Sequence, residues 1–296
     1  MHPELLLDAR ADLGEGPVWD ASRGLLYWVD IHAGRLHTYD PVEQVDDWVH
    51  VGERLGCIAP LAVSLQTQGT SLLIALNSGF MTLNLPSQRM VILANPEPHL
   101  PGNRFNDGKC DPAGRFLAGT MDDAEKEASG SLYSYSTDGT LKTLLTGVRI
   151  SNGLTWSPDF QIFYYIDSPT RQVTAFDYDL ATGNIANPRL AINVPPKMGW
   201  PDGMTSDFEG MLWVALWGGA KLTRWNPANG QLLEAIPIPV LNVTSCIFGG
   251  PDLTDLYITS ARKGMSAEQL AKYPLSGGLF RIRTKIRGMP SFVFGG

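Results

Sequence analysis

The sequence predicts an all-β fold, a six-bladed β-propeller. Three observations favour it: short apolar runs alternate with turn signals, helical periodicity is nearly absent, and the runs recur every ~45–50 residues. The 31 glycines and 21 prolines in 296 residues exceed the usual share of these turn-forming residues. A strand-rich repeat of this length is typical of a propeller blade built from four strands.

Individual elements follow from local patterns. Residues 24–31, 161–167, 210–217 and 255–261 are short, aromatic-rich runs of the kind that forms strands. Turn signals at residues 20–24, 111–114 and 157–159 come just before such runs. The one helix that the sequence predicts covers residues 266–272, with Ser266 as its N-cap and Glu268 in its first turn.

The repeat count comes from small polar pairs that recur in one phase. These pairs are Glu15-Gly16, Asp107-Gly108, Asn152-Gly153, Asp202-Gly203 and Ser245-Cys246. The first gap is twice as long as the others, which predicts a degenerate unit near residues 59–63 and six units in all. We expect one domain over residues 1–296, with a strand at residues 4–7 completing a blade begun by the C-terminal strands. Regular spacing weighs against the rival architecture, a pair of β-sandwiches.

Composition and charge exclude several classes of function. The net charge of −7 argues against a general binder of nucleic acid or of anionic membranes, since both surfaces are negative. No apolar stretch reaches the ~18 residues that a membrane span needs. The first ten residues lack the basic and apolar regions of a signal peptide. The three cysteines, Cys57, Cys110 and Cys246, form no C-x-x-C pair and are expected to be buried thiols, so we predict a cytoplasmic location.

The repeat phase also predicts a functional site. Equivalent positions in successive blades point to equivalent places around the axis, and here they hold Glu15, Asn106 with Asp107, Asn152 and Asp202. Any one of these residues could simply form a turn, but four in one phase are harder to explain that way. Converging carboxylates repel each other unless a cation neutralises them. An oxygen-rich set suits Ca²⁺, Mg²⁺ or Mn²⁺, and ligand type leaves Zn²⁺ and Fe²⁺ open.

The chain resembles the gluconolactonase/regucalcin (senescence-marker-protein) family along essentially its whole length. The best stretches are LGEGPVWD (13–20), NRFNDGKCDPAGRFLAGTM (103–121), ISNGLTWSPD (150–159), FYYIDS (163–168), FDYDLATG (176–183) and PDGMTSDFEGMLWVA (201–215). The resemblance implies a six-bladed propeller that hydrolyses sugar lactones with one divalent metal ion.

Site residues transfer from the family's motifs. The resemblance implies that Glu15, Asn152 and Asp202 hold the metal and that Asp202 also transfers the proton. It implies that Arg104 and Asn106 contact the substrate. The regucalcin members also use a Glu after the GTM motif, a position that falls on Ala124 here, which leaves Asp122, Asp123 and Glu125 as candidate replacements.

The expected function is hydrolysis of an aldonolactone, such as gluconolactone, to the aldonic acid, with a small-molecule sugar lactone as the partner and neither nucleic acid nor membrane. Two alternatives stay open. One is a calcium-binding or regulatory propeller with a structural metal, which the presence of Arg104, Asn106 and Asp202 disfavours. The other is hydrolysis of another ester, such as a phosphotriester, where similar enzymes more often use a histidine near their metal.

Overall fold

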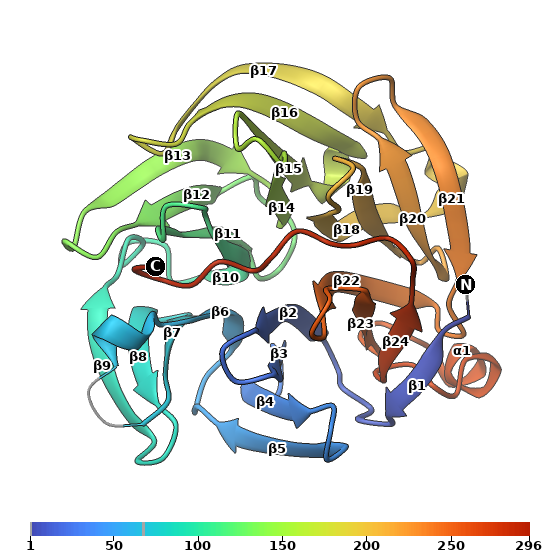
Figure 1. The fold of residues 1–296 in the computed structure, drawn as a ribbon, viewed down its shortest axis with the longest axis horizontal. Helices are drawn as coiled ribbons and strands as arrows, with labels where there is room; N and C mark the ends of the chain where they lie inside the picture. Colours follow the sequence, from blue (N-terminus) through green and yellow to red (C-terminus); the bar gives the residue numbers. More distant parts are fainter. Residues whose placement is uncertain (1, 67–68) are drawn as a thin grey trace.

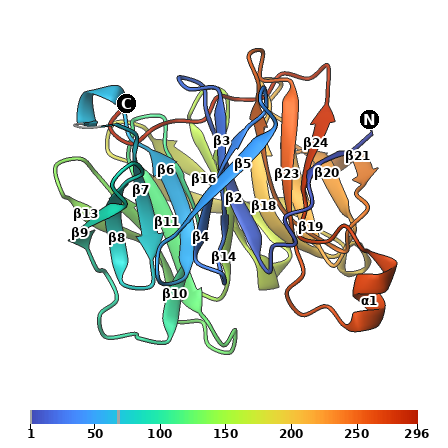
Figure 2. The same cartoon turned by 90° about the horizontal axis from the view of Figure 1, so that it is seen from below.

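A computed structural model of the chain describes residues 2–66 and 69–296. Across these residues, six antiparallel sheets of four strands each stand around a central axis, as Figure 1 shows along that axis. The side view in Figure 2 shows the innermost strands running roughly along the axis. This arrangement confirms the predicted six-bladed β-propeller.

Five blades take four consecutive strands each, from the axis outward. The first blade consists of β2 (Gly14–Asp20), β3 (Leu25–Asp30), β4 (Arg35–Asp40) and β5 (Val45–His50). The second consists of β6 (Leu55–Pro60), β7 (Ser71–Leu76), β8 (Gly79–Asn84) and β9 (Arg89–Ala94). The third consists of β10 (Asn103–Cys110), β11 (Phe116–Asp122), β12 (Gly130–Tyr135) and β13 (Leu141–Val148). The fourth consists of β14 (Ser151–Trp156), β15 (Ile162–Asp167), β16 (Gln172–Asp179) and β17 (Asn184–Asn193). The fifth consists of β18 (Trp200–Ser206), β19 (Leu212–Trp217), β20 (Lys221–Asn226) and β21 (Gln231–Pro237).

The sixth blade closes the ring with strands from both ends of the chain. Its strands are β22 (Asn242–Gly249), β23 (Asp255–Ala261), β24 (Leu279–Arg283) and, outermost, β1 (Glu4–Leu7). β1 pairs antiparallel with β24, and Glu4 forms an ion pair with Arg281 opposite it. The expected closure by a strand at residues 4–7 is therefore confirmed.

Short helices occupy the connections. They are η1 (Val63–Leu65), η2 (Ser168–Thr170), η3 (Pro196–Met198) and α1 (Ala267–Lys272). The predicted N-cap of α1 is confirmed: the Ser266 hydroxyl accepts from the backbone N–H of Gln269, and the Gln269 side chain accepts from the backbone N–H of Ser266.

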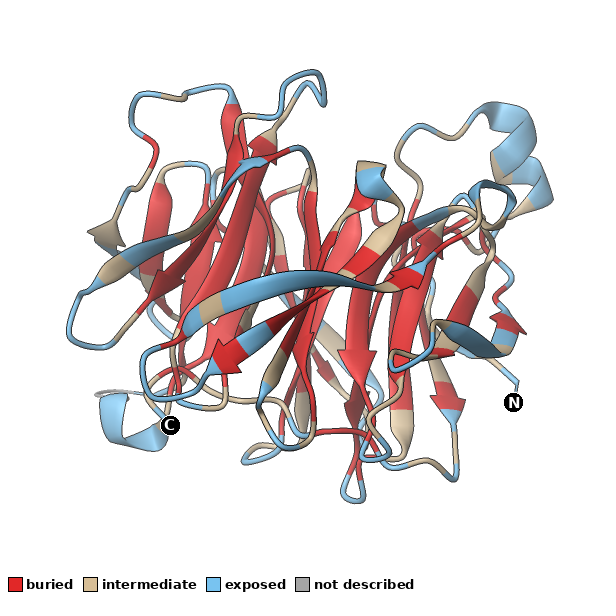
Figure 3. Cartoon of the chain, turned by 90° about the horizontal axis from the view of Figure 1, so that it is seen from above, coloured by how far each residue is buried: buried red, intermediate tan, exposed pale blue. Residues whose placement is uncertain are grey.

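Burial falls from the axis outward, as Figure 3 shows. Every residue of β2, β6, β14 and β22 is buried, whereas β5 and β9 are mostly exposed. The innermost strands contact each other around the axis, so apolar and polar side chains are both excluded from water there. Cys57, Cys110 and Cys246 are buried free thiols, as expected.

The predicted turns form as their sequences indicate. Asp20 Oδ1 accepts hydrogen bonds from the backbone N–H and the hydroxyl of Ser22, and Gly24 takes a φ of +67° that favours glycine. Asp111 and Gly114 repeat this arrangement in the third blade, where Gly114 has a φ of +77°.

Every innermost strand shifts its register once against the second strand of its blade. In β2 the shift falls between Glu15 and Val18, and in β18 between Pro201 and Met204. Such a bulge re-aims the side chains beside it. In the second blade the shift falls between Leu55 and Cys57, which places that blade's marker at Gly56 rather than near residues 59–63.

Two blades therefore differ from the predicted markers at this level, and only the second has no polar side chain there. In the sixth blade the shift falls between Val243 and Ser245, so Thr244 takes the place that the sequence alignment gave to Ser245-Cys246. Residues 59–63 contain the end of β6 and the start of η1 instead. The second unit is hard to place from the sequence, because Gly56 has apolar neighbours and the other units are recognised by polar pairs.

The C-terminal segment covers one end of the ring, where Figure 1 shows it crossing in red. The backbone N–H of Met289 donates to Ser206 O at 3.0 Å, and that of Phe294 donates to Pro60 O at 2.8 Å. Ser206 and Pro60 are the last residues of their innermost strands. The segment thus lies opposite the starts of these strands, where the predicted site residues lie. Among the described residues, no helix is long and apolar enough to cross a membrane.

Candidate functional site

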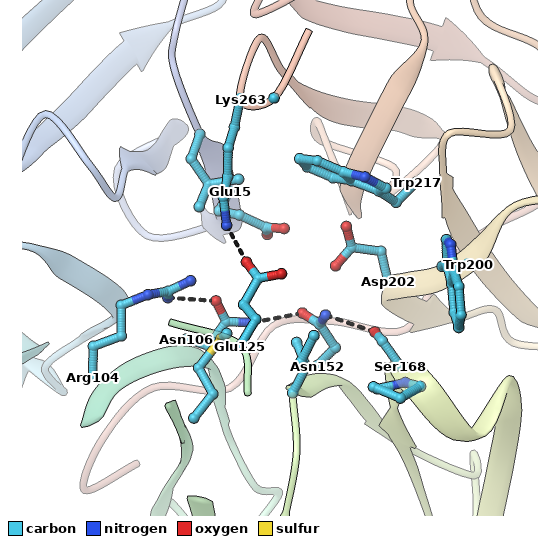
Figure 4. Close-up of a pocket in the computed structure, with 15 residues that line it drawn as sticks. Glu15, Arg104, Asn106, Glu125, Asn152, Ser168, Trp200, Asp202, Trp217 and Lys263 are labelled. Atoms are coloured by element: carbon cyan, nitrogen blue, oxygen red, sulfur yellow. Dashed lines mark hydrogen bonds and ion pairs between the residues drawn. The ribbon is translucent and has the colours of Figure 1, made fainter. Parts of the chain in front are cut away.

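The starts of the innermost strands surround a cavity of about 440 Å³. Glu15 enters it from β2, Asn106 from β10, Asn152 from β14 and Asp202 from β18 (Figure 4). Arg104 of β10 lines it as well. The structure therefore brings together all five residues that the sequence assigned to the site, and all five are buried.

The two members of the Asn106-Asp107 pair separate. Asn106 faces the cavity, whereas Asp107 is absent from its lining and accepts a hydrogen bond from the Gly108 N–H at 2.8 Å. Lys109, whose ammonium donates to Met204 O at 2.9 Å, supplies a positive charge near Asp107. Asp107 thus raises the pKa values of Glu15 and Asp202 without lining the cavity.

A chain of hydrogen bonds fixes the amide side chains. Arg104 Nη1 donates to Asn106 Oδ1 at 2.6 Å, and Asn106 Nδ2 donates to Asn152 Oδ1 at 2.9 Å. Asn152 Nδ2 then donates to Ser168 Oγ at 2.8 Å, and Ser168 donates to Pro201 O at 2.6 Å. Asn106 Nδ2 also donates to Ser151 O at 2.7 Å, so the chain of donors and acceptors sets which end of each amide is the oxygen. The Asn152 oxygen keeps a second lone pair for a ligand.

Burial and mutual repulsion disfavour the charged forms of Glu15 and Asp202. Burial, and next the neighbouring Asp107, raise the pKa of Glu15 to about 8. Burial, and next Glu15, raise the pKa of Asp202 well above its usual range. Without a cation between them, the pair therefore favours a protonated state near neutral pH.

Arg104 is held from the side away from Asn106. Its Nε donates to Asp123 Oδ1 at 3.0 Å, and Asp123 also pairs with Arg54. Burial, and next the Arg54 charge, lower the pKa of Arg104 to about 10, which leaves it cationic at neutral pH. A loop residue after β11 thus positions a side chain of β10.

Asp122, Asp123 and Glu125, the three candidate replacements for the family's Glu, have different partners in the structure. The carboxylate of Asp122 accepts from the backbone N–H groups of Lys126 and Glu127 and stabilises the loop. Asp123 holds Arg104. Glu125 alone of the three lines the cavity, and its carboxylate pairs with Lys263 (Figure 4).

Sequence reasoning missed several residues that line the cavity. They are Leu13, Met121, Ile150, Ser168, Pro169, Trp200, Trp217, Lys263 and Gly264. Trp200 lies two residues before Asp202, which is the one sequence signal that could have found it. Lys263 lies in the connection after β23 and carries no repeat signal. Figure 4 shows Trp200 and Trp217 flanking Asp202, and Lys263 beside Glu125.

The donor set fits a hard divalent cation. Glu15 and Asp202 supply carboxylate oxygens, and Asn152 supplies a neutral amide oxygen. Within residues 2–66 and 69–296, no three side chains of the His, Cys, Asp and Glu types cluster as a metal site, which agrees with a set of only two carboxylates. A cation would neutralise these carboxylates, whose raised pKa values reflect their burial without one.

Comparisons with known proteins agree with this geometry. A family model described as "SMP-30/Gluconolactonase/LRE-like region" matches residues 13–262. Regucalcin of Oryctolagus cuniculus is 39% identical over 99% of this chain and 98% of its own. YvrE of Bacillus subtilis (strain 168), named provisionally as a sugar lactone lactonase, is 36% identical over 100% of this chain and 99% of its own.

Solved structures share the whole fold. A luciferin-regenerating enzyme superposes with a TM-score of 0.92 at 32% identity, covering 99% of this chain and 98% of that one. A regucalcin of Agrobacterium tumefaciens, described as a calcium-binding protein, superposes with a TM-score of 0.93 at 26% identity, covering 99% and 97%. The chain belongs to the SMP-30/gluconolactonase/LRE-like family.

Proposed function

We propose that this chain hydrolyses a sugar lactone to the free aldonic acid with the help of one divalent cation. The observation that carries the proposal is the meeting of Glu15, Asn152 and Asp202 with Arg104 and Asn106 at one end of the ring. The family supports hydrolysis of this class, and the name of YvrE supports a sugar lactone as the substrate.

Glu15, Asn152 and Asp202 would hold the cation through oxygen atoms. When bound, a divalent cation supplies Lewis acidity for the lactone carbonyl and lowers the pKa of water. The all-oxygen donor set favours Ca²⁺, Mg²⁺ or Mn²⁺ over the softer Zn²⁺ and Fe²⁺. We propose Asp202 as the proton-transfer residue, because its carboxylate lines the cavity with Arg104 and Asn106, and the family resemblance implies this role for it.

Asp202 accepts one proton during the proposed reaction and returns it. One Asp202 carboxylate oxygen accepts a proton from water while the water oxygen forms a bond to the lactone carbonyl carbon. The bond between that carbon and the ring oxygen then breaks, and the ring oxygen takes the proton from Asp202. The products are a carboxylic acid and a hydroxyl group on the opened chain.

Arg104 and Asn106 position the substrate. Asp123 fixes the Arg104 guanidinium, and the guanidinium in turn donates a hydrogen bond that fixes the Asn106 side chain. Pre-set donors of this kind orient lactone and hydroxyl oxygens without reorganising during the reaction. Glu125 and Lys263 line the outer part of the cavity and can contact further hydroxyl groups.

A calcium-binding role is the second candidate, supported by the description of the Agrobacterium tumefaciens relative. A binding role alone would need the three oxygen donors but not a buried, fixed Arg104 beside them. The Arg104–Asp123 pair therefore favours hydrolysis.

The test is acid release from sugar lactones, corrected for spontaneous hydrolysis. We expect Asp202→Ala to abolish activity while circular dichroism stays unchanged, because the side chain faces the cavity. Asp47→Ala, at an exposed position on the outer strand β5, is the matched control and should keep full activity. Activity in folded Asp202→Ala equal to that of the wild type would overturn the assignment.

A further inference from the structure

Two tryptophans form one side of the cavity. Trp200, the first residue of β18, pairs in register with Trp217, the last residue of β19. Cross-strand partners lie close enough for their side chains to act together. Both line the cavity, and Figure 4 shows them flanking Asp202. Trp200 is 41% exposed, so part of its ring is open to the cavity and to solvent.

Trp200 is held in place from behind. The Arg171 guanidinium carbon lies 3.4 Å from the centre of the Trp200 ring, which is a cation–π contact. Arg171 Nη1 donates to Gly199 O at 2.8 Å and to Pro196 O at 3.3 Å, so the guanidinium is itself fixed. One face of the ring is thus covered. Figure 4 shows the ring nearly edge-on, with a broad face turned toward Asp202.

The other side of the cavity is charged. Glu125 and Lys263 pair there, and both side chains are partly exposed. Figure 4 shows this pair on the far side of Asp202 from Trp200. The cavity therefore joins a flat aromatic face to a polar pair. Its volume of about 440 Å³ lies in the range of pockets that enclose ligands larger than one six-carbon lactone.

We propose that Trp200 and Trp217 form a subsite for a second pyranose ring, so that the preferred substrate is the lactone of a disaccharide acid. This inference rests on the proposed lactone hydrolysis and names its substrate class. A pyranose ring has a flat face of C–H groups and a rim of hydroxyl groups. The C–H face packs against Trp200, and hydroxyl groups of the lactone unit reach Glu125 and Lys263 on the far side of Asp202. An alkyl or aryl substituent would cover the same ring without the rim of hydroxyl groups that keeps a sugar solvated where Trp200 is 41% exposed.

The test compares two substrates on the metal-loaded enzyme. The kcat/KM of cellobiono-δ-lactone is expected to exceed that of δ-gluconolactone about tenfold, the size of effect that one good aromatic contact supplies. Trp200→Ala should remove this preference, mainly through KM for the disaccharide lactone. Trp200→Leu, which keeps apolar bulk without a ring face, should do the same, and Trp200→Phe should keep part of the preference.

The chain offers a matched control. Trp48 on β5 is 51% exposed and has Arg35 4.4 Å from its ring centre, but it lies on an outermost strand. Trp48→Ala should leave both values of kcat/KM unchanged. It repeats the loss of an exposed, cation-covered tryptophan without touching the cavity.

Four outcomes would overturn the subsite, its sugar assignment or the proposed function. Equal substrate ratios in the wild type and Trp200→Ala, with gluconolactone still hydrolysed, overturn the subsite alone. An equal loss for both substrates in Trp200→Ala also overturns it, because it indicates disturbance of Asp202. A larger loss for γ-phenyl-γ-butyrolactone than for cellobionolactone overturns the sugar assignment. Absence of hydrolysis of every lactone by the wild type refutes the proposed function itself.

Discussion

Replacing Asp202 by Asn separates stability from function. Asp202 is buried, and burial together with the nearby Glu15 and Asp107 raises its pKa. Asn has almost the same shape and no charge, so the change removes electrostatic repulsion without leaving a cavity. In the metal-free protein at pH 8, we expect Asp202→Asn to be more stable than the wild type.

The magnitude follows from the charges. Two unit charges ~4 Å apart repel by about 4 kcal/mol at an effective dielectric constant of ~20, and protonation of the pair relieves much of this. A gain of about 1–2 kcal/mol is therefore expected, which is about 2–6 °C in Tm. With cation at 100 times its Kd, the wild type should gain about 2.7 kcal/mol and the variant little, because it has lost one of two carboxylate donors. Activity should fall about 10²–10⁴-fold.

The assay is thermal unfolding followed by circular dichroism, in EDTA and in excess Ca²⁺. Asp47→Asn, with the same change on the exposed face of β5, controls for net charge and should behave as the wild type. A variant less stable than the wild type in EDTA, or stabilised equally by Ca²⁺, would refute the reasoning.

Three further outcomes are expected. Arg104→Ala should raise KM for a lactone at least tenfold while Ca²⁺ still raises Tm, because Arg104 is fixed beside Asn106 and is not a proposed metal ligand; unchanged kinetics would remove it from the site. The raised pKa values of Glu15 and Asp202 mean that the metal-free native state binds more protons than the unfolded chain from about pH 4 to 8. Its free energy of unfolding should therefore fall as pH rises through that window, and a higher Tm in EDTA at pH 8.5 than at pH 5.5 would contradict this. A thiol reagent should label no cysteine rapidly in the native state and all three in guanidinium, because burial raises the thiol pKa values; rapid native labelling would contradict the burial of Cys57, Cys110 and Cys246.

The sequence predicted the ring well because a propeller repeats itself. Turn chemistry at Asp20 and Asp111 and the phase of the polar pairs were enough to place six blades and to bring Glu15 and Asp202 together. The same reliance on polar pairs misplaced the second unit, where Gly56 lies among apolar residues. The bulge in the second blade holds a glycine, which has no side chain to enter the cavity, so no polar residue in the sequence indicates it.

The outer part of the cavity could not be predicted from local patterns. Lys263 and Glu125 lie far apart in the sequence and meet only because the ring closes. Glu125 takes a left-handed φ of +59° in a loop whose path depends on Asp122 and its backbone partners. Trp200 and Trp217 look like ordinary strand residues until their register is known.

Metal-dependent lactone hydrolysis is tested most directly by acid release from δ-gluconolactone after removal and return of metal. The enzyme is stripped with a chelator, its metal content is measured, and Ca²⁺, Mg²⁺, Mn²⁺, Zn²⁺ or Fe²⁺ is restored singly. We expect activity to be lost on stripping and to return with at least one ion. Full activity in demonstrably metal-free protein, or no activity on any sugar lactone with metal bound, would contradict it, and the second result would favour the calcium-binding role.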